Sequence, residues 1–196
     1  VSSPQTSESD LLTHALCDLT RRTGMPVAFG GFEHHQSVEV TGVVGNRTPH
    51  LSGLVVRATR GLGGRALVEQ RPRLALDYRS SRQITHDYDH AVLGEGIATL
   101  FAVPVVVGCH SRAVLYAGNY SRTAFGENVA RTAMSVAAEL AIELRVHDEV
   151  ARQLSVAMPA AAAALSPAAR EELRSTYAEL RGISADVSDP RLRARL

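Results

Sequence analysis

The chain has 196 residues, of which 45% are hydrophobic and 21% are charged, and its formal net charge is +1. This composition supplies a core for one domain of ordinary size with an appendage, and it excludes an intrinsically disordered chain. All 21 basic residues are arginines, which excludes lysine-dependent phosphate loops and Schiff-base chemistry. The near-zero net charge also argues against DNA binding by this segment alone.

The sequence lacks the usual marks of a membrane or secreted protein. Its longest strongly apolar run, 100–108, is shorter than the roughly 20 residues that a transmembrane helix needs. No export signal is recognisable, and the two cysteines, Cys17 and Cys109, are too few for a disulfide framework. We therefore expect a cytoplasmic protein with no membrane partner. Residues 1–10 are polar and are predicted to form a disordered tail.

Apolar residues in the first half of the chain follow helical spacing first and strand spacing afterwards. An amphipathic helix with Ser9 or Asp10 as its N-cap is predicted to stop at Gly24. The segment 45–96, called the insertion below, is expected to be largely irregular. The predicted elements are the helix from Leu11 to Gly24, strands over 26–33 and 38–44, a helix over 65–70, a strand over 74–77 and a short helical turn within 86–93.

The second half contains a predicted β-hairpin and a long helix. Strands over 99–107 and 112–120 are expected to pair through a turn at 108–110. Over 126–158, apolar residues recur every three or four positions, which predicts one helix of about 50 Å at 1.5 Å per residue. Pro159 is expected to end or kink this helix.

The length of that helix predicts a dimer. It is longer than a compact domain of this size is wide, so its far half should present Val150, Leu154 and Met158 as an uncovered apolar ridge. A second amphipathic helix is predicted over 167–183. We expect a homodimer through 126–158 and this second helix. The alternative is that the second helix folds back onto its own chain.

The hairpin and the residues after it resemble the second half of a GAF domain. The apolar strand 101–108 with its internal proline, the strand 112–118, and Phe125 before an Ala-rich helix follow the pattern of that family. Ala113 stands where the family commonly has glycine. The resemblance extends roughly over 11–154.

Three further segments, 61–67, 77–78 and 88–97, resemble a narrower group, the GAF sensors of actinobacterial transcription regulators that end in a LuxR-type helix-turn-helix. The resemblance implies a small-molecule-sensing GAF domain over 11–157 that is not catalytic. It would transmit its ligand state through the long helix. Residues 158–196 would be a helical linker to a DNA-binding domain outside this chain.

The resemblance also implies an α+β fold. A central antiparallel sheet of five to six strands would carry the N- and C-terminal helices on one face and the insertion on the other, with a ligand pocket beneath the insertion. The alternative is that the aromatic residues only pack the insertion onto the sheet. The residues expected to line the pocket are Phe29, Tyr78, His86, Tyr88, Asp89, His90, Phe101 and Tyr116.

Two local patterns are open to more than one interpretation. His86 and His90 are four residues apart and would share one side of a helix, as metal ligands do, but we expect a polar pocket wall or a solvated loop without metal or cofactor. The glycines of segment 61–64 could hold an anion at a helix N-terminus beside Arg60 and Arg65. A tight turn against the sheet is the favoured interpretation, because no Lys-Ser/Thr pair follows.

Two alternative functions compete with the sensing function. Cys109 lies at the predicted hairpin tip beside His110, which suggests a thiol-dependent free methionine sulfoxide reductase of the kind found among GAF proteins. A GAF dimerisation scaffold with a filled pocket is the other. No nucleophile, base and orienting group come together in the sequence, so we predict that the chain is not an enzyme. Its expected partners are a small-molecule effector, a second copy of itself, and DNA through a module outside this chain.

Overall fold

The computed structural model describes residues 7–122 and 125–164, and side chains in the last helix as far as Ser155. The chain divides into two compact units, Val1–His147 and Asp148–Leu196. The predicted helix over 167–183 lies outside the described residues. No described helix combines the length and apolar content that crossing a bilayer requires.

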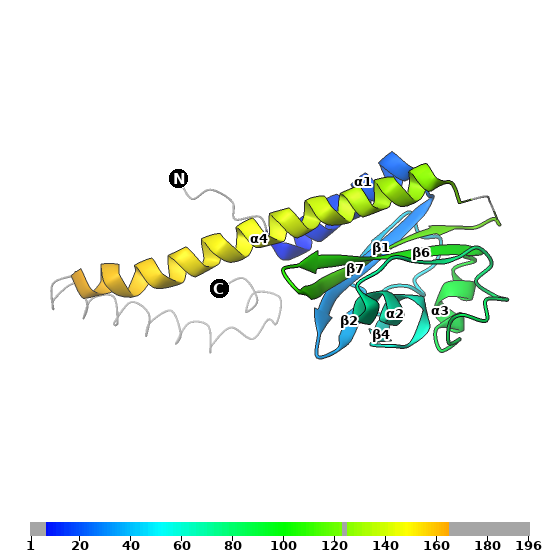
Figure 1. The fold of residues 1–196 in the computed structure, drawn as a ribbon, viewed down its shortest axis with the longest axis horizontal. Coiled ribbons are helices and arrows are strands. Elements are labelled where there is room, and N and C mark those ends of the chain that lie inside the picture. The colour runs from blue at the N-terminus through cyan, green and yellow to red at the C-terminus, as the bar shows by residue number, and fades with distance from the viewer. Residues whose placement is uncertain (1–6, 123–124, 165–196) are drawn as a thin grey trace, which may run out of the picture. The chain divides into compact units, whose positions relative to one another are not determined.

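The first unit is an α+β domain built on an antiparallel sheet (Figure 1). Six strands follow the order β4-β2-β1-β7-β6-β5, and β3 pairs with β1 to make seven, against five to six predicted. The elements are α1 (Glu8–Thr23), β1 (Val27–His34), β2 (Ser37–Glu39), β3 (Gly42–Val44), β4 (Val55–Arg57), α2 (Gly61–Glu69), β5 (Arg73–Ala75), α3 (Asp89–Gly94), β6 (Thr99–Val107), β7 (His110–Asn119) and α4 (Glu127–Ala164), which continues into the second unit.

Helix α1 begins earlier than the sequence pattern predicts. Ser7 is its N-cap, and a capping box joins the Ser7 and Asp10 side chains to each other's backbone N–H groups. The prediction of Ser9 or Asp10 as the cap is therefore wrong, as is a disordered tail that reaches residue 10. The predicted stop at Gly24 is confirmed, because Gly24 adopts a left-handed φ of 70° at the C-cap.

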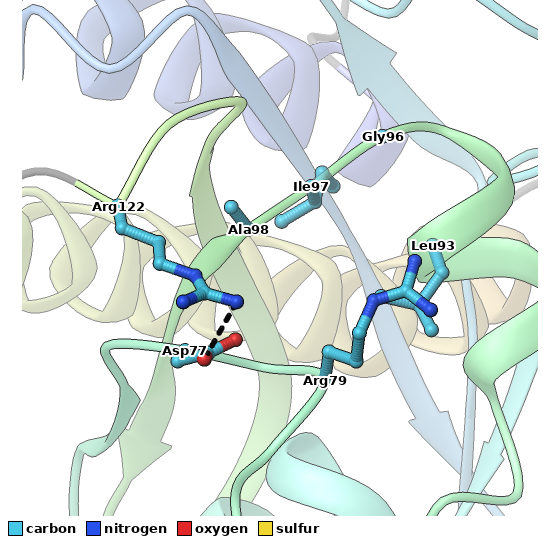
Figure 2. A pocket seen from close by; sticks show the side chains of 7 residues that line it. All are labelled: Asp77, Arg79, Leu93, Gly96, Ile97, Ala98 and Arg122. Atoms are coloured by element: carbon cyan, nitrogen blue, oxygen red, sulfur yellow. Dashed lines mark ion pairs between the residues drawn. The ribbon is translucent and has the colours of Figure 1, made fainter.

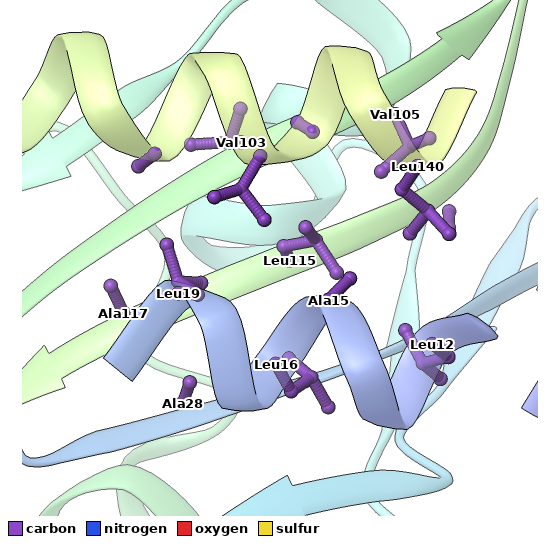
Figure 3. Close-up of a cluster of buried hydrophobic side chains, with 14 of the residues drawn as sticks. Leu12, Ala15, Leu16, Leu19, Ala28, Val103, Val105, Leu115, Ala117 and Leu140 are labelled. Carbon is purple, nitrogen blue, oxygen red and sulfur yellow. The ribbon is translucent and has the colours of Figure 1, made fainter. Parts of the chain in front are cut away.

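Both faces of the sheet are covered, each by its own apolar cluster. The helix-side core lies under α1 and α4, where side chains such as Leu16 and Leu140 meet Val103 and Leu115 (Figure 3). The insertion-side core lies on the opposite face, under α2 and α3. This arrangement, with both long helices on one face and the insertion on the other, is the one expected for a GAF-like domain.

A register shift divides the predicted strand 38–44. β2 pairs with β1 through Glu33↔Val38, whereas β3 pairs with it through Ala28↔Val44, so the sum of partner numbers changes by one. Val38 therefore faces the insertion-side core while Val44 packs against the helix-side core, whereas one regular strand over 38–44 would place both on the same side. Gly31 lies opposite the shift, where a Cβ atom would be 1.7 Å from the Glu39 carbonyl oxygen.

Helix α4 runs from Glu127 to Ala164, so Pro159 does not end it. Its first half packs on the sheet as predicted, with Ala133, Leu140 and Leu144 buried. On the exposed side of α4, four apolar side chains recur every four residues and form a stripe. They are Ile142, Val146, Val150 and Leu154.

Candidate functional site

A small cavity lies between the sheet and the insertion, where the pocket was predicted. Its volume is only about 10 Å³, which is room for about one water molecule. Aromatic and aliphatic side chains fill most of the space. The cavity, called the aromatic cavity below, is lined by Phe29, Leu54, Val56, Leu62, Gly63, Tyr78, Tyr88, Val92, Leu100 and Tyr116.

Tyr116 lines this cavity from the sheet. It projects from β7 and stacks on Phe29 of β1, with ring centroids 4.5 Å apart and an interplanar angle of 6°. The side chain is 3% exposed, and its hydroxyl has no hydrogen-bond partner among the residues that the structure describes. Burial raises the pKa of this hydroxyl far above its usual value, so it remains a neutral donor. A buried hydroxyl without a partner is rare, and this one lies beside Gly63, which also lines the cavity.

The first turn of α2 lies directly against the Tyr116 hydroxyl. A Cβ atom on Gly63 would be 1.8 Å from that oxygen, so only glycine allows the helix to approach the ring. Gly61 is at a positive φ of 60°. The glycines thus serve close packing against the sheet, as the favoured interpretation had it. Arg60, at the N-cap, supplies no capping hydrogen bond.

Two tyrosines of the insertion form the outer wall of the aromatic cavity. Tyr78 is almost fully buried, and burial raises its pKa far above the ordinary range. Tyr88, just before α3, is half-buried, and its hydroxyl accepts a hydrogen bond from the Arg57 backbone N–H at 2.8 Å. Of the predicted pocket residues, Phe29, Tyr78, Tyr88 and Tyr116 therefore come together.

Phe101 is on the other side of the sheet. Its neighbour Ala102, not Phe101, is paired with Tyr116, so the two aromatic side chains point to opposite faces. Phe101 belongs to the helix-side core, where its ring lies 4.7 Å from that of Phe125. The prediction that Phe101 lines the pocket is wrong.

The three polar candidates, His86, Asp89 and His90, lie outside the lining of the aromatic cavity. The His86 ring is hydrogen-bonded to Asp89 at 2.9 Å and to the Ser81 carbonyl oxygen at 3.0 Å. The Asp89 carboxylate raises the pKa of His86, with a further contribution from that carbonyl. His90 is exposed, and its ring meets that of His50 edge-on. These three residues therefore lie at the outer surface of the insertion.

Glu95 is a residue that the sequence reasoning missed. It is 2% exposed, and its carboxylate accepts hydrogen bonds from the Arg47 and Thr48 backbone N–H groups and from the Thr48 and Tyr120 hydroxyls. Burial alone would raise the pKa of Glu95, but these bonds outweigh it and hold the pKa below the ordinary value. Burial and Glu95 raise the pKa of the Tyr120 hydroxyl to about 12, and its one proton is shared between Glu95 and the Gly45 carbonyl oxygen. Glu95 thus joins the start of the insertion to the end of β7.

A second, more polar cavity opens beside the ends of β5 and β7. Its volume is about 120 Å³, and Asp77 forms an ion pair with Arg122 at 3.0 Å. Figure 2 shows this pair across from the Arg79 guanidinium. Leu93 and Ile97 form its apolar side. The side chains of Arg79 and Arg122 are exposed, so water solvates both charges.

The two cysteines are free thiols on the surface. Cys109 is in the turn between β6 and β7, as predicted, and its carbonyl oxygen accepts a hydrogen bond from Gln70. Cys17 is on α1.

Similar folds occur in proteins with different activities. The structure is similar to the GAF domain of a phosphoenolpyruvate-protein phosphotransferase from Coxiella burnetii, with a TM-score of 0.63 and 16% identity over 77% of this chain and 89% of that one. It is also similar to a type II free methionine-R-sulfoxide reductase from Thermoplasma acidophilum, with a TM-score of 0.56 and 15% identity over 68% of this chain and 89% of that one. The fold is therefore GAF-like.

No protein-family model matches the sequence. A relative at a higher level of identity is the HTH-type transcriptional activator RamA of Corynebacterium glutamicum, which is 32% identical over 196 residues. The match covers 96% of this chain and 69% of RamA, so it includes both the GAF-like domain and the residues after it. The chain belongs to the family of the transcriptional activator RamA.

Proposed function

We propose that this chain is the sensing part of a cytoplasmic transcription regulator of the LuxR type. A small-molecule effector would bind in the aromatic cavity and bias the position of α4, which would reposition a DNA-binding module outside this chain. Membership in the family of a helix-turn-helix activator supports the regulatory role. The near-neutral charge of +1 supports DNA contact through another module.

The observation that carries the ligand-binding part is the unpartnered Tyr116 hydroxyl. This hydroxyl is buried beneath the insertion, on the face of the sheet opposite α1 and α4. A fold selected only as a scaffold has no use for such a group, because a phenylalanine would pack there without the cost of a buried unsatisfied hydroxyl. We therefore favour a sensor over the dimerisation scaffold.

Native mass spectrometry of the protein purified from its own host tests the proposal. We expect a dissociable small-molecule adduct on the wild-type protein, and a loss of that adduct in a Val92→Phe variant, which adds a ring to the cavity wall. If the protein carries no adduct and gains none from cell extract, the scaffold becomes the better explanation.

The exposed stripe on α4 supports a homodimer. Ile142 is 60% exposed and Leu154 is 45% exposed, and the spacing of four residues between stripe members suits helix-to-helix packing. We expect a dimer at micromolar concentration, and Leu154→Glu should shift it toward monomer because a carboxylate would be buried in the interface. Sedimentation equilibrium measures this, with Ser155→Glu as the control beside the stripe. A wild-type monomer would contradict the proposal.

A substitution of Cys109 distinguishes the sensor hypothesis from the reductase hypothesis. We expect Cys109→Ser to leave effector binding within about twofold of wild type, because this thiol lies in a surface turn and does not line the aromatic cavity. A methionine sulfoxide reductase activity that the wild-type protein shows and the variant loses would establish the reductase function instead.

A further inference from the structure

Hydrogen-bond donors without a partner among the described residues lie at the aromatic cavity. The Tyr116 hydroxyl is one. The first N–H groups of a helix have no acceptor within the helix, and in α2 the side chain of Arg60 does not cap them. The Gly61 N–H is bonded to the Thr85 hydroxyl, whereas Leu62 and Gly63, the next two residues, line the cavity.

The rest of the lining is apolar and uncharged. The rings of Phe29 and Tyr78 and the side chains of Val56 and Leu100 face the space, and no Arg, Asp, Glu or His is among the lining residues. The Tyr88 hydroxyl accepts a hydrogen bond from the Arg57 N–H, and its own O–H proton is an uncharged donor. A buried anion here would have no cationic side chain to compensate for the water it loses, so the surroundings favour a neutral ligand.

The present volume of about 10 Å³ cannot admit more than a water molecule, so one wall has to move. Tyr88 is the side chain placed to do so. It is only half-buried, it precedes α3, and its hydroxyl is held by a hydrogen bond from the Arg57 N–H. Tyr116 and Phe29, stacked and nearly fully buried, form the fixed floor.

We infer that the effector is a compact, neutral molecule with a flat apolar body and one acceptor oxygen, bound by the Tyr116 hydroxyl and the first turn of α2. The inference rests on the proposed function, since it describes the ligand of that same cavity. The acceptor oxygen would give the buried hydroxyl the partner it lacks, and the partial positive charge at the start of α2 would strengthen the contact.

Acetophenone and ethylbenzene test the inference, because they have nearly the same shape and differ in one carbonyl oxygen. Their binding to the whole chain is measured by NMR titration, in the wild type and in Tyr88→Ala, which opens the movable wall. We expect acetophenone to bind about three- to tenfold more tightly than ethylbenzene in Tyr88→Ala. Adding Tyr116→Phe should reduce this preference to about twofold or less, while the affinity for ethylbenzene stays the same. Benzoate should bind more weakly than acetophenone.

Each other outcome has a distinct meaning. Equal affinities for acetophenone and ethylbenzene would overturn the inference and leave the pocket of the proposed function standing. Tighter binding of benzoate than of acetophenone would overturn the inference that the effector is neutral. If no probe binds either protein while circular dichroism shows that Tyr88→Ala is folded, the inference fails together with the pocket.

Discussion

Replacing Glu95 with glutamine is expected to lower the free energy of unfolding by about 2–4 kcal/mol. The Glu95 carboxylate is buried and accepts hydrogen bonds from two backbone N–H groups and two hydroxyls. A glutamine of the same shape has only one acceptor oxygen, and its NH₂ group would face donors that need an acceptor. Chemical denaturation of the purified chain measures the loss. Glu143→Gln, on the exposed surface of α4, is the control and should change stability by less than about 0.5 kcal/mol.

The pH dependence of stability gives a second signature of Glu95. Its pKa in the folded protein lies below the ordinary value of 4.5, so its contribution is complete above that value and is lost as the pH falls through the folded pKa. We expect the wild type to lose stability more steeply than Glu95→Gln below about pH 4.5. Parallel stability curves for the two proteins would show that the carboxylate charge does not matter there.

Replacing Gly63 with alanine is expected to destabilise the fold by about 1–3 kcal/mol and to abolish effector binding. The new Cβ would be 1.8 Å from the Tyr116 hydroxyl oxygen and 2.4 Å from Cζ, so α2 or the stacked ring must shift. Thermal unfolding measures the effect. Gly126→Ala is the matched control, because its Cβ would meet nothing within 4 Å.

The cause of the Gly63 effect can be isolated with a second substitution. In a Tyr116→Leu background the ring atoms are absent. Gly63→Ala should therefore lower the free energy of unfolding less in that background than it does in the wild type. If the cost is the same in both backgrounds, the collision with Tyr116 is not the cause, and the close approach of α2 to β7 has to be explained differently.

Local sequence determined most of the elements. Gly24 ends α1 because glycine adopts a left-handed φ without a steric cost, and this requires no knowledge of the rest of the chain. The hairpin of β6 and β7 followed from two apolar runs with Gly108 between them, and Gly108 has a φ of 62°. The burial of Leu140 and Leu144 followed from their spacing along α4. These features depend on neighbours in sequence.

Tertiary structure decided which face each residue occupies. Both faces of β6 are buried, so its apolar run carries no alternation to tell the side of Phe101 from that of Ala102. The register shift opposite Gly31 moved Val44 to the helix side, and a shift of one residue reverses every later side chain. The groups that donate hydrogen bonds to Glu95 belong to Arg47, Thr48 and Tyr120, which are distant from it in sequence. Strand register and long-range hydrogen bonds form only when the whole sheet assembles, which is why the sequence predicted the location of the cavity but not its full lining.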